Sequence, residues 1–345
     1  MPPKKEKLDY PALIRRLRSE GPGGVYLLWG EEDYLREQFV QELRRACLGE
    51  NDDGFDYKRI DGAAPDLDEV QEAADAMPFF SERVFIELRG FDVNKCKADD
   101  AERFKKILSS LPDSCTMAIV LPTGYEPDGR LSLVKAVRKH GEAVEFTAQE
   151  QGQLLRWIAR RMEADGKTIS RSDAEYLIFY CGELMTRLGN EISKLTHYVS
   201  GDTITRADIE AVTDRTAQTT VFQMTEALAA REYGKATRYL AELLGSKESP
   251  IGLVAMIGRQ FRQLFAAKAA QEYRLGGAFV TEICGVDRDY LVRKLTDTAR
   301  GFSLTQLARA VTLCAETDYA MKSSSADDEE LLVDLLLKLA AGDAA

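Results

Sequence analysis

The stretch VYLLWGEEDYLREQ, residues 25–38, decides the fold. Its first six residues are almost continuously apolar, as in strands that are buried on both faces of a parallel sheet. A helical pattern follows at once, and four further β-rich runs alternate with helical stretches up to residue 147. The sequence therefore predicts an α/β domain with right-handed crossovers. The predicted strands are 25–30, 55–61, 83–88, 116–121 and 142–147, and the predicted helices between them are 33–48, 66–76, 99–110 and 131–139.

The five predicted strands are not alike. The run 55–61, FDYKRID, mixes polar and apolar residues, so we expect it at an edge of the sheet or in a less buried position. The other four are nearly continuous apolar runs, and we expect them to be buried on both faces.

The turn after the first strand is where a nucleotide-binding protein would hold phosphate groups. A phosphate loop needs G-x-x-x-x-G-K-[ST], because the glycines let backbone N–H groups approach the phosphates and the Lys reaches the terminal ones. Here Gly30 is followed by Glu31, Glu32 and Asp33, and the second glycine, the Lys and the hydroxyl residue are absent. Three carboxylates would repel a triphosphate. The turn therefore predicts acidic N-capping of a helix and no cofactor.

Beyond residue 147 the pattern predicts helices and no strands. A first helical group ends near Val212 and includes a capping box formed by Thr205 and Asp208. A second group runs to the end of the chain. We therefore predict three domains, 1–147, 148–212 and 213–345, of which the last two are all-α. The helices expected in the last domain are 221–231, 233–244, 250–273, 287–298, 303–322 and 327–341.

The composition limits the possible functions. The formal net charge of −11 argues against a chain that binds DNA tightly by itself, since phosphate attraction dominates such binding. Two histidines, His140 and His197, leave little for a Ser-His-Asp or His-metal site. The six cysteines show no C-x-x-C spacing, which favours reduced, cytosolic thiols and no metal site. No apolar run is long enough for a membrane span, and no apolar segment follows the basic residues of 1–11, so we expect neither membrane insertion nor secretion.

The segment AMPFFSERVFIEL, residues 76–88, places two adjacent phenylalanines behind a proline, between a helix and a strand. Adjacent side chains point about 100° apart on a helix and to opposite faces on a strand. One core cannot easily accept both rings, so at least one is a candidate for exposure. From the residues alone, burial of both remains the simpler interpretation.

The order and spacing of several segments resemble the delta subunit of bacterial DNA polymerase III, the clamp-loader subunit. The resemblance covers essentially the whole chain. It is carried by VYLLWGEEDYLREQ and AMPFFSERVFIEL in the first domain and by LMTRLGNEISKLTHYV in the second. In the third it is carried by VFQMTEALAAREYGKATRYLAELL, IGRQFRQLFAAK and LARAVTLCAETDYAMKSS…LLVDLLLKLA. It implies a degenerate AAA+-type domain, a small helical lid domain and a helical collar domain.

The resemblance also implies a binding site. Family members bind the sliding clamp through a hydrophobic plug before the third strand, which falls here on Met77, Phe79 and Phe80, with Pro78 stiffening the loop. The family often has Leu-Phe, so Phe79 is a conservative departure. This chain lacks the Ser-Arg-Cys string that supplies an arginine finger in active relatives. The resemblance therefore implies a non-catalytic component of the DNA polymerase III holoenzyme, a nucleotidyltransferase assembly.

Further partners follow from the resemblance: the sliding clamp (beta), the motor (tau/gamma) and delta-prime subunits, and primer–template DNA within the assembly, in the cytoplasm and with no membrane. Two alternatives remain for the residues named at the end of this paragraph. Each basic residue can simply be part of the solvated surface, and the leucines can form the internal core of their own helical bundle. A divergent AAA+ ATPase and an adaptor for another partner stay open as functions. Candidate DNA contacts are Arg259, Arg262 and Lys268, with Arg288, Arg293, Lys294 and Arg300, and the candidate subunit interface is Leu331, Leu335, Leu336 and Leu339.

Overall fold

The structure is a computed structural model that describes residues 9–49, 54–246, 248–286 and 289–342. Most of the basic N-terminal segment and Arg288 lie outside the described residues. The chain forms two compact units, one made of Met1–Leu154 with Glu183–Gly189 and the other of Leu155–Gly182 with Asn190–Ala345. The predicted division into three domains stays a prediction.

The first unit contains a five-stranded, all-parallel sheet with the strand order β2-β3-β4-β1-β5. Each strand begins and ends within two residues of its predicted position, and the predicted α/β class is confirmed. The helix α1 was not predicted. The elements are α1 (Tyr10–Glu20), β1 (Val25–Gly30), α2 (Asp33–Leu48), β2 (Tyr57–Asp61), α3 (Leu67–Asp75), β3 (Val84–Arg89), α4 (Ala98–Ser109), β4 (Cys115–Val120), α5 (Ser132–His140) and β5 (Gly141–Phe146).

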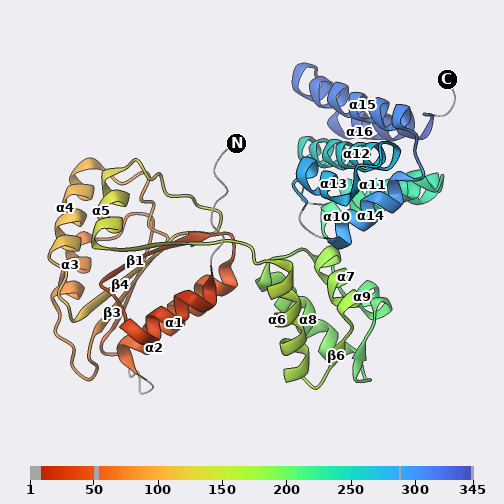
Figure 1. Ribbon diagram of the computed structural model, residues 1–345. Helices are drawn as coiled ribbons and strands as arrows, with labels where there is room; N and C mark the ends of the chain where they lie inside the picture. Colours follow the sequence, from red (N-terminus) through yellow and green to blue (C-terminus); the bar gives the residue numbers. More distant parts are fainter. Residues whose placement is uncertain (1–8, 50–53, 247, 287–288, 343–345) are drawn as a thin grey trace. The chain divides into compact units, whose positions relative to one another are not determined.

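Helices cover both faces of the sheet, with α3, α4 and α5 on one face and α1 and α2 on the other (Figure 1). Val70, Phe104 and Val134 extend the apolar core of β1, β3 and β4 on the first face. On the second face the ring of Phe39, on α2, packs against Phe146, with 5.9 Å between the ring centroids.

The two edge strands show where the sequence pattern holds and where it fails. β2 lies at one edge and is mostly exposed or half-buried, as its mixed composition predicted. β5 lies at the other edge, and only two of its six residues are fully buried. The expectation that this strand is buried on both faces is therefore wrong, because an edge strand has a neighbour on one side only.

The described residues of the second unit are helical apart from two short strands, which pair in parallel through Thr168–Thr203 and Ile169–Ile204. The expectation of no strand after residue 147 is wrong at this pair. The Thr205–Asp208 capping box is confirmed. The elements that begin before residue 213 are α6 (Gln151–Ala164), which starts in the first unit, β6 (Thr168–Ile169), α7 (Arg171–Cys181), α8 (Met185–Tyr198), whose first turn belongs to the first unit, β7 (Thr203–Ile204) and α9 (Arg206–Val212).

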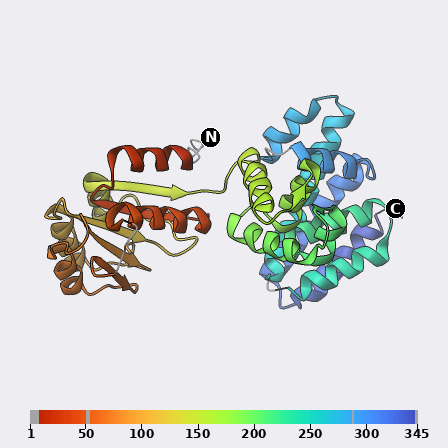
Figure 2. The ribbon, with the colours of Figure 1, turned by 90° about the horizontal axis from the view of Figure 1, so that it is seen from below.

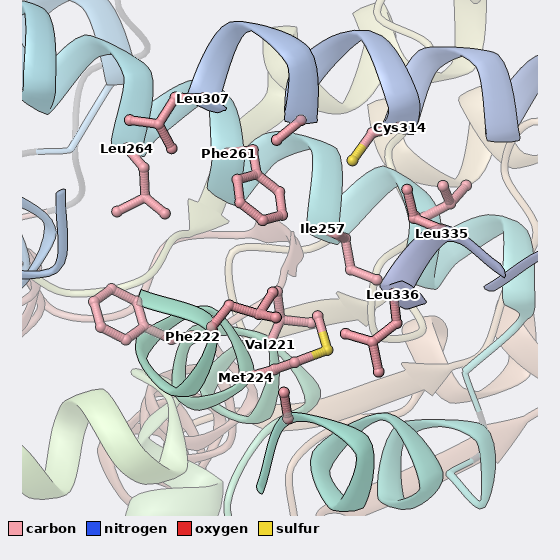
Figure 3. Packing of buried hydrophobic residues seen from close by; sticks show 14 of the residues in the cluster. Val221, Phe222, Met224, Ile257, Phe261, Leu264, Leu307, Cys314, Leu335 and Leu336 are labelled. Atoms are coloured by element: carbon pink, nitrogen blue, oxygen red, sulfur yellow. The ribbon is translucent and has the colours of Figure 1, made fainter. Parts of the chain in front are cut away.

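The remaining helices pack around α12, which contacts most of the others (Figures 1 and 2). Phe261 and Ile257 of α12 point into a core shared with Phe222 and Leu307 (Figure 3). The helix α13 was not predicted. The elements are α10 (Ala217–Ala229), α11 (Tyr233–Leu244), α12 (Pro250–Glu272), α13 (Gly276–Cys284), α14 (Asp289–Ala299), α15 (Leu304–Ser323) and α16 (Asp328–Ala340).

Candidate functional site

The segment between α3 and β3, residues 76–83, carries an exposed apolar group and is called the aromatic loop below. Met77 is 90% exposed, Phe79 is 76% exposed and Phe80 is 63% exposed. At least one ring was a candidate for exposure, and both are exposed. Burial of both rings, which the residues alone favoured, is therefore wrong. Pro78, between Met77 and Phe79, is half-buried.

A third ring, which the sequence did not single out, joins the two. Phe55 precedes β2 and is 75% exposed. Its ring centroid lies 5.5 Å from that of Phe80, edge to face, and 6.5 Å from that of Phe79. Phe79 and Phe80 are themselves edge to face at 4.5 Å. The three residues, called the ring cluster below, are therefore in mutual contact while most of their surface faces solvent.

The topology explains why distant residues meet here. β2 and β3 are parallel neighbours, with Tyr57 opposite Phe85. Phe55 and the aromatic loop each come just before one of these strands. Since neighbouring parallel strands begin at the same end of a sheet, the two segments are brought side by side.

The carboxylate of Asp56 fixes the aromatic loop to the start of β2. One oxygen accepts a hydrogen bond from the Phe79 backbone N–H (2.6 Å). The other accepts from the Phe80 and Ser81 N–H groups (2.8 and 2.7 Å). Asp56 is only 5% exposed. Three consecutive donors around one buried carboxylate hold the backbone of the loop in a single conformation.

The same contacts set the charge state of Asp56. Burial by itself would raise the pKa of this carboxyl, but the three backbone N–H donors outweigh that effect and lower the pKa below its usual value. Asp56 is therefore ionised throughout the neutral range, and the donors face a full negative charge.

The turn after β1 has a different character. Gly30 has φ +123°, and a Cβ atom there would collide with the backbone of Phe146 on β5. Beyond it, a Glu31 oxygen accepts a hydrogen bond from the Ala148 N–H (3.3 Å). The Arg36 guanidinium is buried and donates to the Gly30 carbonyl (3.2 Å). The turn is thus filled by its own side chains and by the chain that leaves β5.

Glu32 is the most unusual group in this turn. It occupies the N-cap position of α2, but its side chain makes no capping hydrogen bond there, so the predicted acidic capping is not confirmed. The side chain is fully buried and instead accepts a hydrogen bond from the Met185 N–H (3.1 Å), at the start of α8. Its second oxygen is buried and has no hydrogen-bond partner. Burial raises the pKa of Glu32 to about 7, and the Met185 N–H offsets only part of that effect. A buried carboxyl at this place opposes the approach of a phosphate group.

The basic residues predicted on α12 differ in their surroundings. Arg259 and Arg262 are exposed, whereas Lys268 is half-buried, 3.9 Å from a Glu272 oxygen. Three further candidates are held in ion pairs, which leaves less charge for an outside anion. These pairs are Arg293–Glu175 (3.2 Å), Lys294–Glu226 (2.8 Å) and Arg300–Asp297 (3.1 Å). A role in binding DNA stays a prediction for all of them.

The leucines of α16 lie mainly inside their own bundle. Leu335 and Leu336 are buried in the core of the second unit (Figure 3), and Leu331 and Leu339 pack against it. This packing is the internal core that the sequence left open as the alternative, and it corrects the expectation that Leu335 and Leu336 face a neighbouring subunit. Val333 and Leu337 form the exposed apolar part of this helix.

The described residues offer neither a metal site nor a membrane span. No group of three or more His, Cys, Asp or Glu side chains is arranged to hold a metal ion. No helix among these residues is long and apolar enough to cross a membrane.

A parallel sheet with helices on both faces, a strand–helix turn without a phosphate loop and a following set of helices define a degenerate AAA+-like protein. Comparison with known families identifies which one. Residues 26–147 match the family model "DNA polymerase III, delta subunit", and residues 218–339 match "DNA polymerase III delta subunit, C-terminal domain". The chain belongs to the DNA polymerase III delta subunit family, as its sequence predicted.

Individual relatives agree with this assignment. The chain is 27% identical over 324 residues to DNA polymerase III subunit delta of Bacillus subtilis, covering 91% of this chain and 92% of the relative. It is 22% identical over 320 residues to the probable DNA polymerase III subunit delta of Aquifex aeolicus, covering 90% of each. The fold is similar to that of the Bacillus subtilis DNA clamp loader delta protein (YqeN), with a TM-score of 0.50 and 23% identity, covering 96% of this chain and 99% of that one.

Proposed function

We propose that this chain is a non-catalytic clamp-loader subunit that binds the sliding clamp through Met77, Phe79 and Phe80. One observation carries the proposal: these three side chains are 63–90% exposed on a loop whose backbone is fixed by a buried carboxylate. Monomeric proteins seldom display such a group without a partner for it.

The energetics suit a binding loop. Moving one aromatic side chain from water into an apolar pocket contributes about 1.5–3 kcal/mol. A few such anchors usually supply most of the free energy of an interface. Because Asp56 already holds the loop, little conformational entropy is lost when the loop binds.

Clamp opening follows from binding without chemistry in this subunit. A ligand shifts a conformational equilibrium by its differential affinity for the two states. A loop that fits the clamp better when a ring interface is open therefore favours the open clamp. Three acidic residues at the turn after β1, one of them buried, support a subunit that does not use ATP.

The other partners extend this proposal. The motor (tau/gamma) and delta-prime subunits would contact the helices of residues 213–345, and primer–template DNA would pass near the exposed Arg259 and Arg262. Each phosphate contact would add a salt-dependent contribution to binding.

The test is the double variant Phe79→Ala/Phe80→Ala, assayed against the organism's own sliding clamp by titration calorimetry. We expect clamp binding to be lost, and the thermal unfolding midpoint to stay near that of the wild type because both rings are largely exposed. Tyr319→Ala is the matched control, because Tyr319 is 72% exposed on α15 in the other unit. Retained clamp affinity in the double variant would remove the assignment. Saturable ATP binding by the isolated wild-type protein would favour a divergent ATPase instead.

A further inference from the structure

The ring cluster is larger than the plug that the family resemblance implies. We infer that Phe55, in the turn before the adjacent strand β2, is a third aromatic contact of the clamp-binding surface. This inference rests on the proposed function, because it adds a residue to the same binding site.

Exposure and contact together point to Phe55. At 75% exposed, it presents as much apolar surface as Phe79, at 76%. Its ring meets Phe80 edge to face at 5.5 Å and Phe79 at 6.5 Å. Edge-to-face and tilted contacts at these centroid distances are arrangements that aromatic pairs prefer. A partner that covers Phe79 and Phe80 therefore meets the edge of the third ring as well.

The position of Phe55 is tied to the loop by the backbone. Asp56, the next residue, binds three N–H groups of the loop through its carboxylate. The Asp56 carbonyl also accepts a hydrogen bond from the Phe85 N–H (2.8 Å), which fixes this residue to β3. The three rings are thus carried by two segments that are fixed to each other. They are presented to a partner as one preorganised unit.

The arrangement specifies the chemistry of the partner. Edge-to-face packing leaves apolar ring faces pointing in different directions, so the receiving surface must be apolar over a wider area than a pocket for two adjacent side chains. Among the possible partners, a clamp pocket with an apolar rim next to the pocket for Phe79 and Phe80 fits this requirement. A polar rim would leave Phe55 in water.

The first experiment compares Phe55→Ala with wild type, with Phe79→Ala/Phe80→Ala and with Tyr319→Ala, using the full chain and the organism's own clamp. We expect Phe55→Ala to weaken clamp binding about tenfold, with an unchanged thermal unfolding midpoint, and Tyr319→Ala to bind as wild type does. If Phe55→Ala binds like wild type while the double variant does not bind, the third contact is wrong and the proposed function stands. If wild type itself does not bind the clamp, the proposed function fails, and this inference fails with it.

A second variant separates contact from an indirect effect on the loop. In Phe55→Trp the new indole reports its own surroundings, and the wild-type protein, with its two tryptophans, provides the background. We expect the fluorescence of the added indole to shift to shorter wavelength when the clamp is present at saturation. An unshifted spectrum, with clamp bound, would overturn the inference even if Phe55→Ala weakened binding.

Discussion

The substitution Asp56→Asn tests how the aromatic loop is held. The two carboxylate oxygens accept three backbone N–H groups between them, at 2.6, 2.8 and 2.7 Å. An Asn side chain has the same shape but only one acceptor oxygen. If that oxygen keeps the Phe80 and Ser81 donors, the amide NH₂ points at the Phe79 N–H, and that donor loses its acceptor.

The expected magnitude follows from these contacts. A hydrogen bond to a charged group contributes about 1.5–3 kcal/mol to stability. Losing one bond and the charge on the other two should lower the free energy of unfolding of the first unit by about 2–4 kcal/mol. Clamp affinity should fall as well, because the rings must be reordered on binding.

The assay is urea unfolding followed by fluorescence in a Trp157→Phe background. Trp29 on β1 is then the remaining tryptophan and reports on the first unit. The pH dependence gives a second check. The pKa of Asp56 is lowered in the folded protein, so its contribution is present above the unfolded pKa of about 4 and is lost as pH falls through the folded pKa. The difference in the free energy of unfolding between wild type and Asp56→Asn should therefore become smaller below pH 4. Equal stability and equal clamp affinity at pH 7 would refute the role of Asp56.

Two further predictions concern other buried groups. Glu32→Gln keeps an acceptor for the Met185 N–H but removes a charge whose burial raises the pKa to about 7. Between pH 4.5 and 7 the folded protein holds a proton that the unfolded chain has released, so wild type loses stability as pH rises. Chemical unfolding should find the variant equal to wild type near pH 5 and more stable at pH 8, by on the order of 2 kcal/mol. Leu335→Ala, at a core position, should lower the free energy of unfolding of the second unit by about 2–5 kcal/mol. Chemical unfolding monitored by circular dichroism measures this change. Leu337→Ala, at an exposed position, should change it by less than about 0.5 kcal/mol, and equal effects would contradict the packing of α16.

The strands of the first unit were predictable because most of them are short apolar runs between helical patterns, whereas the helix α1 was missed. The misses have local causes. β6 and β7 are two residues each, too short for any periodicity. α13 begins with Gly276 and Gly277, which are poor helix formers, and it is stabilised by packing against α12.

The site was less predictable than the fold. The residues alone made one of Phe79 and Phe80 a candidate for exposure but favoured burial of both, and only the family resemblance implied that both are exposed. Phe55 gave no such signal, because the sequence pattern placed it as the first residue of the predicted strand 55–61. The Asp56 anchor joins residues 23–25 positions apart and depends on strand order alone. The burial of Glu32 likewise depends on Met185, which is far along the chain.

The placement of β2 and β3 has a consequence for how such a molecule can vary. The ring cluster precedes these strands, whereas the Gly30–Asp33 turn follows β1, so the two sites lie at opposite ends of the strands. Along the strand direction they are separated by about 20 Å, the length of a six-residue strand. Side chains at one margin can be exchanged to match a new pocket without touching the other. Amino-acid substitutions in the acidic turn likewise leave the positions of the three rings unchanged.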